Sequence, residues 1–104
     1  METRLLNLRA KIFRALSAAE RLEILEFLHN GEKCVCEIVP HMGVAQPVVS
    51  RHLKILKDSG VVTFRKDGTR RLYSITDPRI FRIINALNPE LINTLTQSMI
   101  DQMA

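Results

Sequence analysis

The apolar side chains of this 104-residue chain change their spacing once and then change back. Up to residue 60 they recur every three or four positions, which predicts amphipathic helices. Residues 61–66 and 70–75 instead alternate like strands on either side of Asp67-Gly68, a dipeptide typical of tight hairpin turns. Helical spacing then returns. The sequence therefore predicts a mainly helical fold that contains a two-stranded hairpin.

Two helices are expected before residue 31. The first covers about Thr3 to Leu16, with leucine, isoleucine and phenylalanine at helical spacing. Ser17 and Glu20 have the spacing of a capping box, in which each side chain satisfies a free backbone amide at the start of a helix. The helix that they open is expected to stop at Gly31.

The next two helices are expected on either side of a tight turn. A short helix covers roughly Cys36 to Met42 and ends at Gly43. Another begins near Gln46-Pro47, because proline is favoured in a first turn, and closes at Ser59-Gly60. Its buried edge is formed by three residues spaced i, i+4 and i+7, namely Val49, Leu53 and Leu56.

Asp77-Pro78 and Asn88-Pro89 each read as an N-cap followed by proline at the first helical position, so we expect two more helices. Two helices around a tight turn, followed by a hairpin, make a winged helix-turn-helix. The predicted fold is thus mainly α with a two-stranded β wing, in a single domain. Its expected parts are a helix-turn-helix at 33–60, a wing at 61–75, and dimerisation helices at 1–16 and 77–104.

The first and last helices carry more apolar surface than a small domain needs. Pairing with a second copy explains this surface, which predicts a homodimer. The alternative is a monomer that folds both ends over its own core.

Positive charge is concentrated in the predicted wing. The chain has a formal net charge of +4, and residues 61–75 hold four basic side chains against one acidic side chain. Such a cluster indicates a polyanion partner, although a solvated basic hairpin would have the same composition. The four candidates for phosphate or minor-groove contacts are Arg65, Lys66, Arg70 and Arg71.

The helix that begins at Gln46 is expected to contact the bases of double-stranded DNA. The second helix of a helix-turn-helix presents its N-terminal side chains to the major groove. Gln46 can bond adenine, Arg51 can bond guanine with both arms of its guanidinium, and Val48 can pack on a thymine methyl group. His52 borders the buried edge, where a structural role or a phosphate contact is expected. The candidate DNA-binding residues of this helix are Gln46, Pro47, Val48, Ser50, Arg51, His52 and Lys54.

Other classes of protein find little support in the sequence. No apolar run approaches the roughly 20 residues of a membrane span, and Glu2, Arg4 and Arg9 interrupt the apolar start of the chain, so no membrane partner and a cytoplasmic location are expected. A glycine-rich phosphate loop, a paired histidine box and a nucleophile elbow are all missing, which argues against an enzyme. A module that binds only other proteins remains an alternative.

Three segments resemble the ArsR/SmtB family of metal-sensing repressors. Residues 32–38, Glu-Lys-Cys-Val-Cys-Glu-Ile, are similar to its cysteine box, and residues 46–60 resemble its recognition helix. Residues 16–25 are similar to its second helix. The resemblance implies a homodimeric repressor bound to a short inverted repeat, which leaves this operator when a thiophilic ion binds Cys34 and Cys36.

The chain departs from the branches of this family in its ligand set. Val39 stands where the arsenic-sensing branch has a third cysteine, and residues 1–33 lack the cysteines of the cadmium and lead branch. No histidine follows Asp77, which argues against the zinc site of the last helices. Ala45 stands where the family often has a serine before the first glutamine of its recognition helix, here Gln46. This difference removes one N-cap bond.

Two cysteines in a reducing compartment are expected to be thiols. Residues i and i+2 of a regular helix point about 200° apart, and Pro40 cannot donate to the carbonyl of Cys36, so either the helix starts near Cys36 or it bends there. Both arrangements let the sulfurs converge on a soft ion such as arsenic(III) or antimony(III), with Glu37 or His41 as a possible third ligand. No cofactor is expected for DNA binding itself.

Two other interpretations of the cysteine pair stay open. The same thiols could sense an oxidant or reactive sulfur, because a C-x-C disulfide is a small ring that is easily reduced. The pair could also be no more than two small, partly buried apolar side chains.

Overall fold

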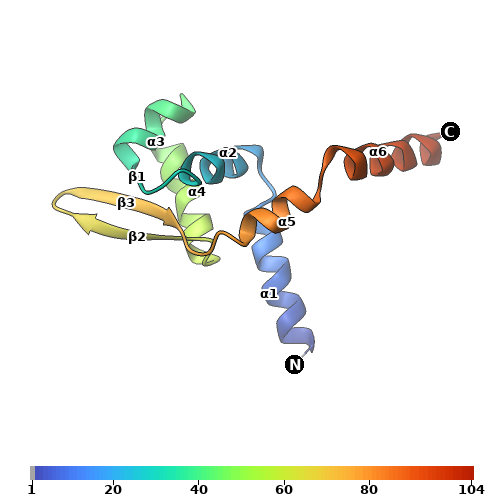
Figure 1. Ribbon diagram of the computed structural model, residues 1–104, viewed down its shortest axis with the longest axis horizontal. Coiled ribbons are helices and arrows are strands. Elements are labelled where there is room, and N and C mark those ends of the chain that lie inside the picture. Colours follow the sequence, from blue (N-terminus) through green and yellow to red (C-terminus); the bar gives the residue numbers. More distant parts are fainter. Residues whose placement is uncertain (1) are drawn as a thin grey trace.

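The computed structural model describes residues 2–104. The helices and strands follow the expected order along the chain (Figure 1). Their bounds are α1 (Glu2–Ala15), α2 (Ala19–Leu28), β1 (Lys33–Cys34), α3 (Val35–Met42), α4 (Gln46–Asp58), β2 (Val62–Asp67), β3 (Arg70–Ile75), α5 (Ile80–Ala86) and α6 (Pro89–Met103).

The core lies between α2, α3, α4 and one face of the sheet. The three residues predicted to form the inner edge of α4 are confirmed there, since Val49, Leu53 and Leu56 are at most 1% exposed. Ile24 and Leu25 of α2 are fully buried against the same cluster. Burying side chains of this size stabilises the fold by about 1.5–3 kcal/mol each, so this small core fixes α4 firmly.

A tight turn joins α3 to α4 as expected. Gly43 ends α3 in the left-handed conformation, at φ 69°, and its amide donates to the carbonyl of Val39. Pro47 lies in the first turn of α4, and Ala45 is an N-cap without a side-chain bond. Together with the β2–β3 hairpin, this pair of helices confirms the winged helix-turn-helix.

The sheet has one strand more than predicted. The two residues of β1 pair with β3, so the strand order is β1-β3-β2. In this register Cys34 lies opposite Leu72, and Phe64 of β2 lies opposite Tyr73 of β3. The segment that carries the first cysteine is therefore hydrogen-bonded directly to the wing.

Two of the predicted helix starts are wrong. Ser17 does not cap α2, because its hydroxyl donates to the carbonyl of Arg14 and Ala18 is the N-cap instead. Asp77 does not begin a helix either, since α5 starts at Ile80 after a turn in which Asp77 accepts from the amide of Arg79. The predicted N-cap at Asn88 is confirmed, since its side chain accepts from the amide of Leu91.

The helices α1 and α6 extend away from the rest of the molecule (Figure 1). None of the residues of α6 is buried, and Ala15 is the one buried residue of α1. Large apolar side chains on both helices are between one third and nine tenths exposed, among them Leu6, Phe13, Leu91, Leu95 and Met99. Within residues 2–104, no helix has the length and apolar character to cross a membrane.

Candidate functional site

A groove of about 810 Å³ runs between α4 and the wing. Its polar and basic wall comes from one stripe of α4 and from the end of the hairpin, namely Gln46, Ser50, Lys54, Lys57, Thr69, Arg70 and Arg71. Its other lining residues are Cys34, Val35, Cys36, Val39, Pro40, Leu53 and Tyr73. The groove therefore places both cysteines beside the residues expected to meet DNA.

The structure brings some of the α4 candidates together and leaves others outside the groove. Gln46, Ser50 and Lys54 are exposed and line it. Lys54 also donates to Asp58 at 2.8 Å, and this bond lowers the pKa of the Asp58 carboxyl. The remaining candidates of α4 are outside the lining of the groove, namely Pro47, Val48, Arg51 and His52.

His52 is partly buried and has a partner in another helix. The guanidinium of Arg21 in α2 lies 3.1 Å from His52 Nδ1. Arginine can only donate, so Nδ1 accepts this bond and the proton of a neutral ring sits on Nε2. Arg21 also donates to the carbonyl of Ala15 at 2.7 Å, which links α1, α2 and α4 through one side chain.

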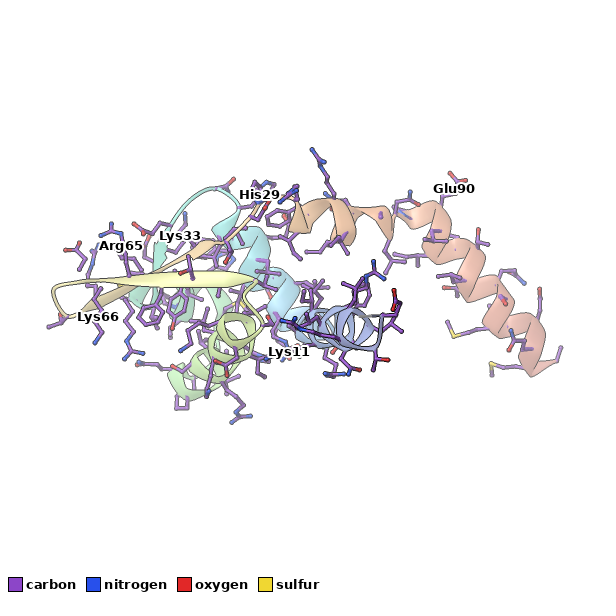
Figure 2. All side chains as sticks on the ribbon, turned by 90° about the horizontal axis from the view of Figure 1, so that it is seen from below. Lys11, His29, Lys33, Arg65, Lys66 and Glu90 are labelled. Atoms are coloured by element: carbon purple, nitrogen blue, oxygen red, sulfur yellow. A yellow bond between two sulfur atoms is a disulfide. The ribbon has the colours of Figure 1, made fainter. Side chains whose placement is uncertain are left out.

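The four basic wing candidates divide into two pairs. Arg70 and Arg71 line the groove, and the Arg71 guanidinium lies 5.3 Å from the centre of the Phe64 ring. Arg65 lies opposite Leu72 and is bonded to Glu32, whereas Lys66 lies opposite Arg71. Side chains alternate along a strand, so Arg65 and Lys66 are on opposite faces of the wing (Figure 2).

The two cysteines lie where the chain passes from β1 into α3, which confirms that the helix starts beside the pair. Cys34 is extended and is the N-cap of α3, and Cys36 lies in the first turn. Their Cα atoms are 5.0 Å apart and the sulfurs form a disulfide. The expectation of free thiols is therefore wrong for the state that the structure describes. The change from the extended Cys34 to the helical Cys36 brings both sulfurs to the same side, where they bond.

The two proposed third ligands are engaged elsewhere. Glu37 Oε1 accepts from the amide of Cys34 at 3.0 Å, which completes a capping box with the Cys34 sulfur. The His41 ring stacks on Phe27 with the ring centres 3.8 Å apart. Throughout residues 2–104, no three side chains of histidine, cysteine, aspartate or glutamate gather in a way that could hold a metal ion.

Two residues of the polar and basic wall of the groove were not among the predicted contacts. Lys57 follows Gln46, Ser50 and Lys54 at helical spacing, so the sequence did contain a signal that it extends the same stripe. Its ammonium lies 5.5 Å from the centre of the Phe64 ring, which connects α4 to the wing. The other residue is Thr69, at the turn of the hairpin, and nothing in the local sequence marks it as a groove residue.

A recognition helix, a basic wing and a groove between them define a winged helix-turn-helix regulator of transcription. Residues 19–63 match the model of a family described as bacterial regulatory protein, arsR family. The chain is 42% identical to an arsenical resistance operon repressor of Staphylococcus aureus over 83% of its own length and 81% of that protein. This chain belongs to the ArsR family, and its Cys34–Cys36 pair fits the C-x-C branch.

Two further proteins are similar to this chain. A probable mercury resistance operon repressor of Streptomyces lividans is 44% identical over 72% of this chain, which spans 60% of that relative's length. The solution structure of a homodimeric winged helix-turn-helix DNA-binding domain from Mycobacterium bovis has a TM-score of 0.74 and 29% identity, and covers 97% of this chain and 89% of that one. Both are described as regulators of transcription, the first as probable and the second as possible.

Proposed function

We propose that two copies of this chain form a DNA-binding repressor that leaves its operator when a thiophilic ion binds Cys34 and Cys36. The observation that carries this proposal is the shared groove, in which both cysteines lie beside basic and polar residues of α4 and the wing. The proposed inducers are arsenic(III), antimony(III) or another soft ion, because thiolates select such ions. The names of the arsenical and mercury resistance relatives support this choice.

In the proposed complex the N-terminal half of α4 occupies the major groove. Gln46 and Ser50 are exposed on the stripe that lines the protein's groove, and Arg51 is exposed beside it. We propose that these three side chains, with Pro47 and the half-buried Val48, meet base edges. The proposed phosphate contacts are Lys54, Lys66, Arg70 and Arg71, with His52 Nε2 and Arg65 as additional donors.

The exposed apolar faces of α1 and α6 support the homodimer. A monomer would leave Leu6 and Phe13 of α1 and Leu91, Leu95 and Ile100 of α6 at least 41% exposed to water. A second copy that covers these faces removes this area from water. Because a two-fold dimer presents two recognition helices, the proposed operator is an inverted repeat.

The position of Cys34 suggests how ion binding would reach the DNA-binding helix. Its sulfur accepts from the amide of Cys36 at 2.9 Å as the N-cap of α3. A thiolate that turns toward an ion leaves this amide without its acceptor and weakens the first turn of α3. Since α3 holds α4 across the Gly43 turn, a shift there would tilt α4 relative to the wing.

A second candidate function is thiol oxidation sensing, which the disulfide between Cys34 and Cys36 favours. In this alternative the two thiols of the DNA-bound form lose two electrons and two protons to an oxidant. Hydrogen peroxide would serve, since it is reduced to two molecules of water. The disulfide form would then be the one that releases the operator.

A single binding experiment separates the two candidates. Duplexes are selected from a random pool with the reduced protein, and fluorescence anisotropy of a labelled selected duplex is followed during additions of arsenite, mercury(II) or hydrogen peroxide. Release by the ions supports ion sensing, whereas release by peroxide alone supports oxidation sensing. The Cys34→Ser/Cys36→Ser variant is expected to bind the duplex and to resist release. If no duplex is selected, or if neither the ions nor peroxide releases it, the proposed function is wrong.

A further inference from the structure

We propose that Phe64 of β2 is a positioning residue for DNA binding, because its ring holds Lys57 of α4 and Arg71 of β3 together as one site for the phosphates of a DNA strand. This inference rests on the proposed function and adds two residues to it, Lys57 and Phe64. Phe64 itself would touch no DNA and would act through the two cations.

The half-buried Phe64 ring has two cations over it. The Lys57 ammonium lies 5.5 Å from the ring centre, and the Arg71 guanidinium lies 5.3 Å from it. Cations within about 6 Å of a ring centre are attracted by the negative charge over its face. Tyr73, which is 6% exposed, stacks on the same ring with the centres 5.4 Å apart. A ring supported by the core therefore holds two exposed cations that come from different elements.

The cations along the groove differ in whether a carboxylate already compensates their charge. Two of the four are paired, as Lys54–Asp58 at 2.8 Å and Arg70–Asp67 at 3.9 Å. Within residues 2–104, Lys57 and Arg71 form no ion pair with a carboxylate. The positive charge that is least compensated in the groove is thus at the Phe64 ring, where an anion would bind both cations.

The path of a DNA strand places phosphates at this ring. With α4 in the major groove, the hairpin beside it reaches the adjacent minor groove. One sugar–phosphate strand separates these two grooves of the duplex, so this strand would pass between α4 and the wing. The protein's own groove of about 810 Å³ runs between the same two elements. Lys57 on α4 and Arg71 on the wing would therefore hold the strand from two sides.

The ring is expected to matter because both cations are long side chains with many rotamers. Each of them loses conformational freedom when it binds a phosphate, and this loss opposes binding. A ring that already holds both side chains beside the groove reduces the loss. Removing the ring should therefore weaken DNA binding although every positive charge of the protein remains.

The first test replaces Phe64 by leucine, which keeps an apolar side chain and removes the aromatic face. Anisotropy titrations of Phe64→Leu with the selected duplex should show an affinity about threefold to tenfold lower. Phe64→Tyr keeps the ring and should bind within about twofold of the unmodified chain. The matched control is Phe27→Leu, which removes another half-buried ring with a lysine over it, Lys33 at 5.1 Å, and should also bind within about twofold.

A second test changes the charge over the ring face and keeps a ring of similar size. Incorporation of pentafluorophenylalanine at position 64 removes the negative charge over the face, and with it the attraction for Lys57 and Arg71. The DNA affinity should fall at least about threefold, while urea denaturation shows that the protein is folded. If the ring only packed on Tyr73, the affinity of the folded protein would not change. This test also stands if Phe64→Leu fails to fold.

A double-mutant cycle tests whether the ring acts through Lys57. Lys57→Gln removes one phosphate contact, so it should weaken binding about threefold to tenfold and lower the salt dependence by about one ion. In the Phe64→Leu protein the same change should weaken binding at most about twofold, because the lysine is no longer held. Both changes should act equally on the selected duplex and on a shuffled duplex, since phosphates carry no sequence information.

The outcomes separate this inference from the proposed function. An equal effect of Lys57→Gln with and without the ring would overturn the inference. So would a folded pentafluorophenylalanine protein that binds DNA as tightly as the unmodified chain. In both cases the unmodified chain still binds the selected duplex, and the proposed function is intact. Failure to select any duplex would overturn both.

Discussion

Both carboxylate oxygens of Glu32 accept hydrogen bonds from the guanidinium of Arg65, each at 2.8 Å. The pair connects the residue before β1 to the middle of β2, so it spans the sheet across β3. It lowers the pKa of the Glu32 carboxyl and raises the pKa of Arg65. Arg65 was predicted to contact DNA, and in this structure its charge is neutralised by Glu32.

Replacing Glu32 by glutamine should strengthen DNA binding. The Glu32→Gln variant frees the charge of Arg65 for a phosphate. We therefore expect an affinity for DNA about twofold to fivefold higher, and a steeper salt dependence because about one more counterion is released on binding. Anisotropy titrations at several salt concentrations measure both. Glu23→Gln, on an exposed position of α2, changes the net charge equally and is the control. If the two variants behave alike, the Glu32–Arg65 pair has no specific influence on the wing.

Arg21 is expected to be important for stability. Its guanidinium bonds the carbonyl of Ala15 and the ring of His52, so Arg21→Gln should lower the free energy of unfolding by about 1–3 kcal/mol. Urea denaturation followed by circular dichroism measures this change. Arg9→Gln, at an exposed position of α1, is the control and should change it by less than about 0.5 kcal/mol. Equal stability of both variants would show that the Arg21 bonds contribute nothing.

A charge on the apolar face of α6 should disrupt the proposed dimer. Leu95 is 49% exposed, and Leu95→Glu would place a carboxylate between the two copies. Sedimentation velocity should show a shift from dimer to monomer, with weaker binding to the selected duplex. Ser98→Glu adds the same charge among the polar residues of α6 and should remain dimeric. A dimeric Leu95→Glu protein would exclude this face from the interface.

A third sulfur should strengthen the binding of arsenite. Val39 lines the groove with both cysteines, so Val39→Cys would supply a third sulfur to arsenic(III), which can form three bonds to sulfur. We expect arsenite to bind the reduced variant at least about tenfold more tightly than the unmodified chain. Tyrosine fluorescence titration measures this gain, and Val44→Cys, an exposed position outside the groove, is the control. No gain with Val39→Cys would mean that this residue cannot reach the arsenic atom.

The carboxyl of Asp77 should make stability depend on pH in acid. Its bonds with Arg79 hold its pKa at about 2, below the ordinary value of 3.8. A lowered pKa contributes stability that is present above about 3.8 and is lost as the pH falls toward about 2. Asp77→Asn should therefore lose less stability than the unmodified chain over this interval, as measured by urea denaturation at each pH. Asp101→Asn, in α6, is the control, and parallel curves for Asp77→Asn and the unmodified chain would contradict the prediction.

Local patterns were sufficient to predict the helices, the hairpin and the inner edge of α4. Val49, Leu53 and Leu56 are inward because their spacing depends on the helix itself. Ser17 shows where a local pattern fails. Its hydroxyl can bond either the start of α2 or the carbonyl of Arg14, and in the structure it donates to Arg14 at 2.6 Å.

The features that the sequence did not predict depend on residues far apart in the chain. Strand β1 has two residues, too few for a periodic pattern, and it exists because β3 offers a free edge. The Glu32–Arg65 bond joins residues 33 positions apart. The groove likewise combines α3, α4 and the wing, so no single segment predicts that the cysteines and the basic side chains line one space.

Because no residue of α6 is buried, the folding of this helix should depend on the concentration of the protein. A 15-residue helix without packing partners is only marginally stable in water, so α6 is expected to be fully ordered when another molecule covers it. Dilution would then melt the end of the chain while the rest stays folded, and the thermal midpoint would rise with protein concentration. In a cell, newly made copies would gain this helix as they accumulate.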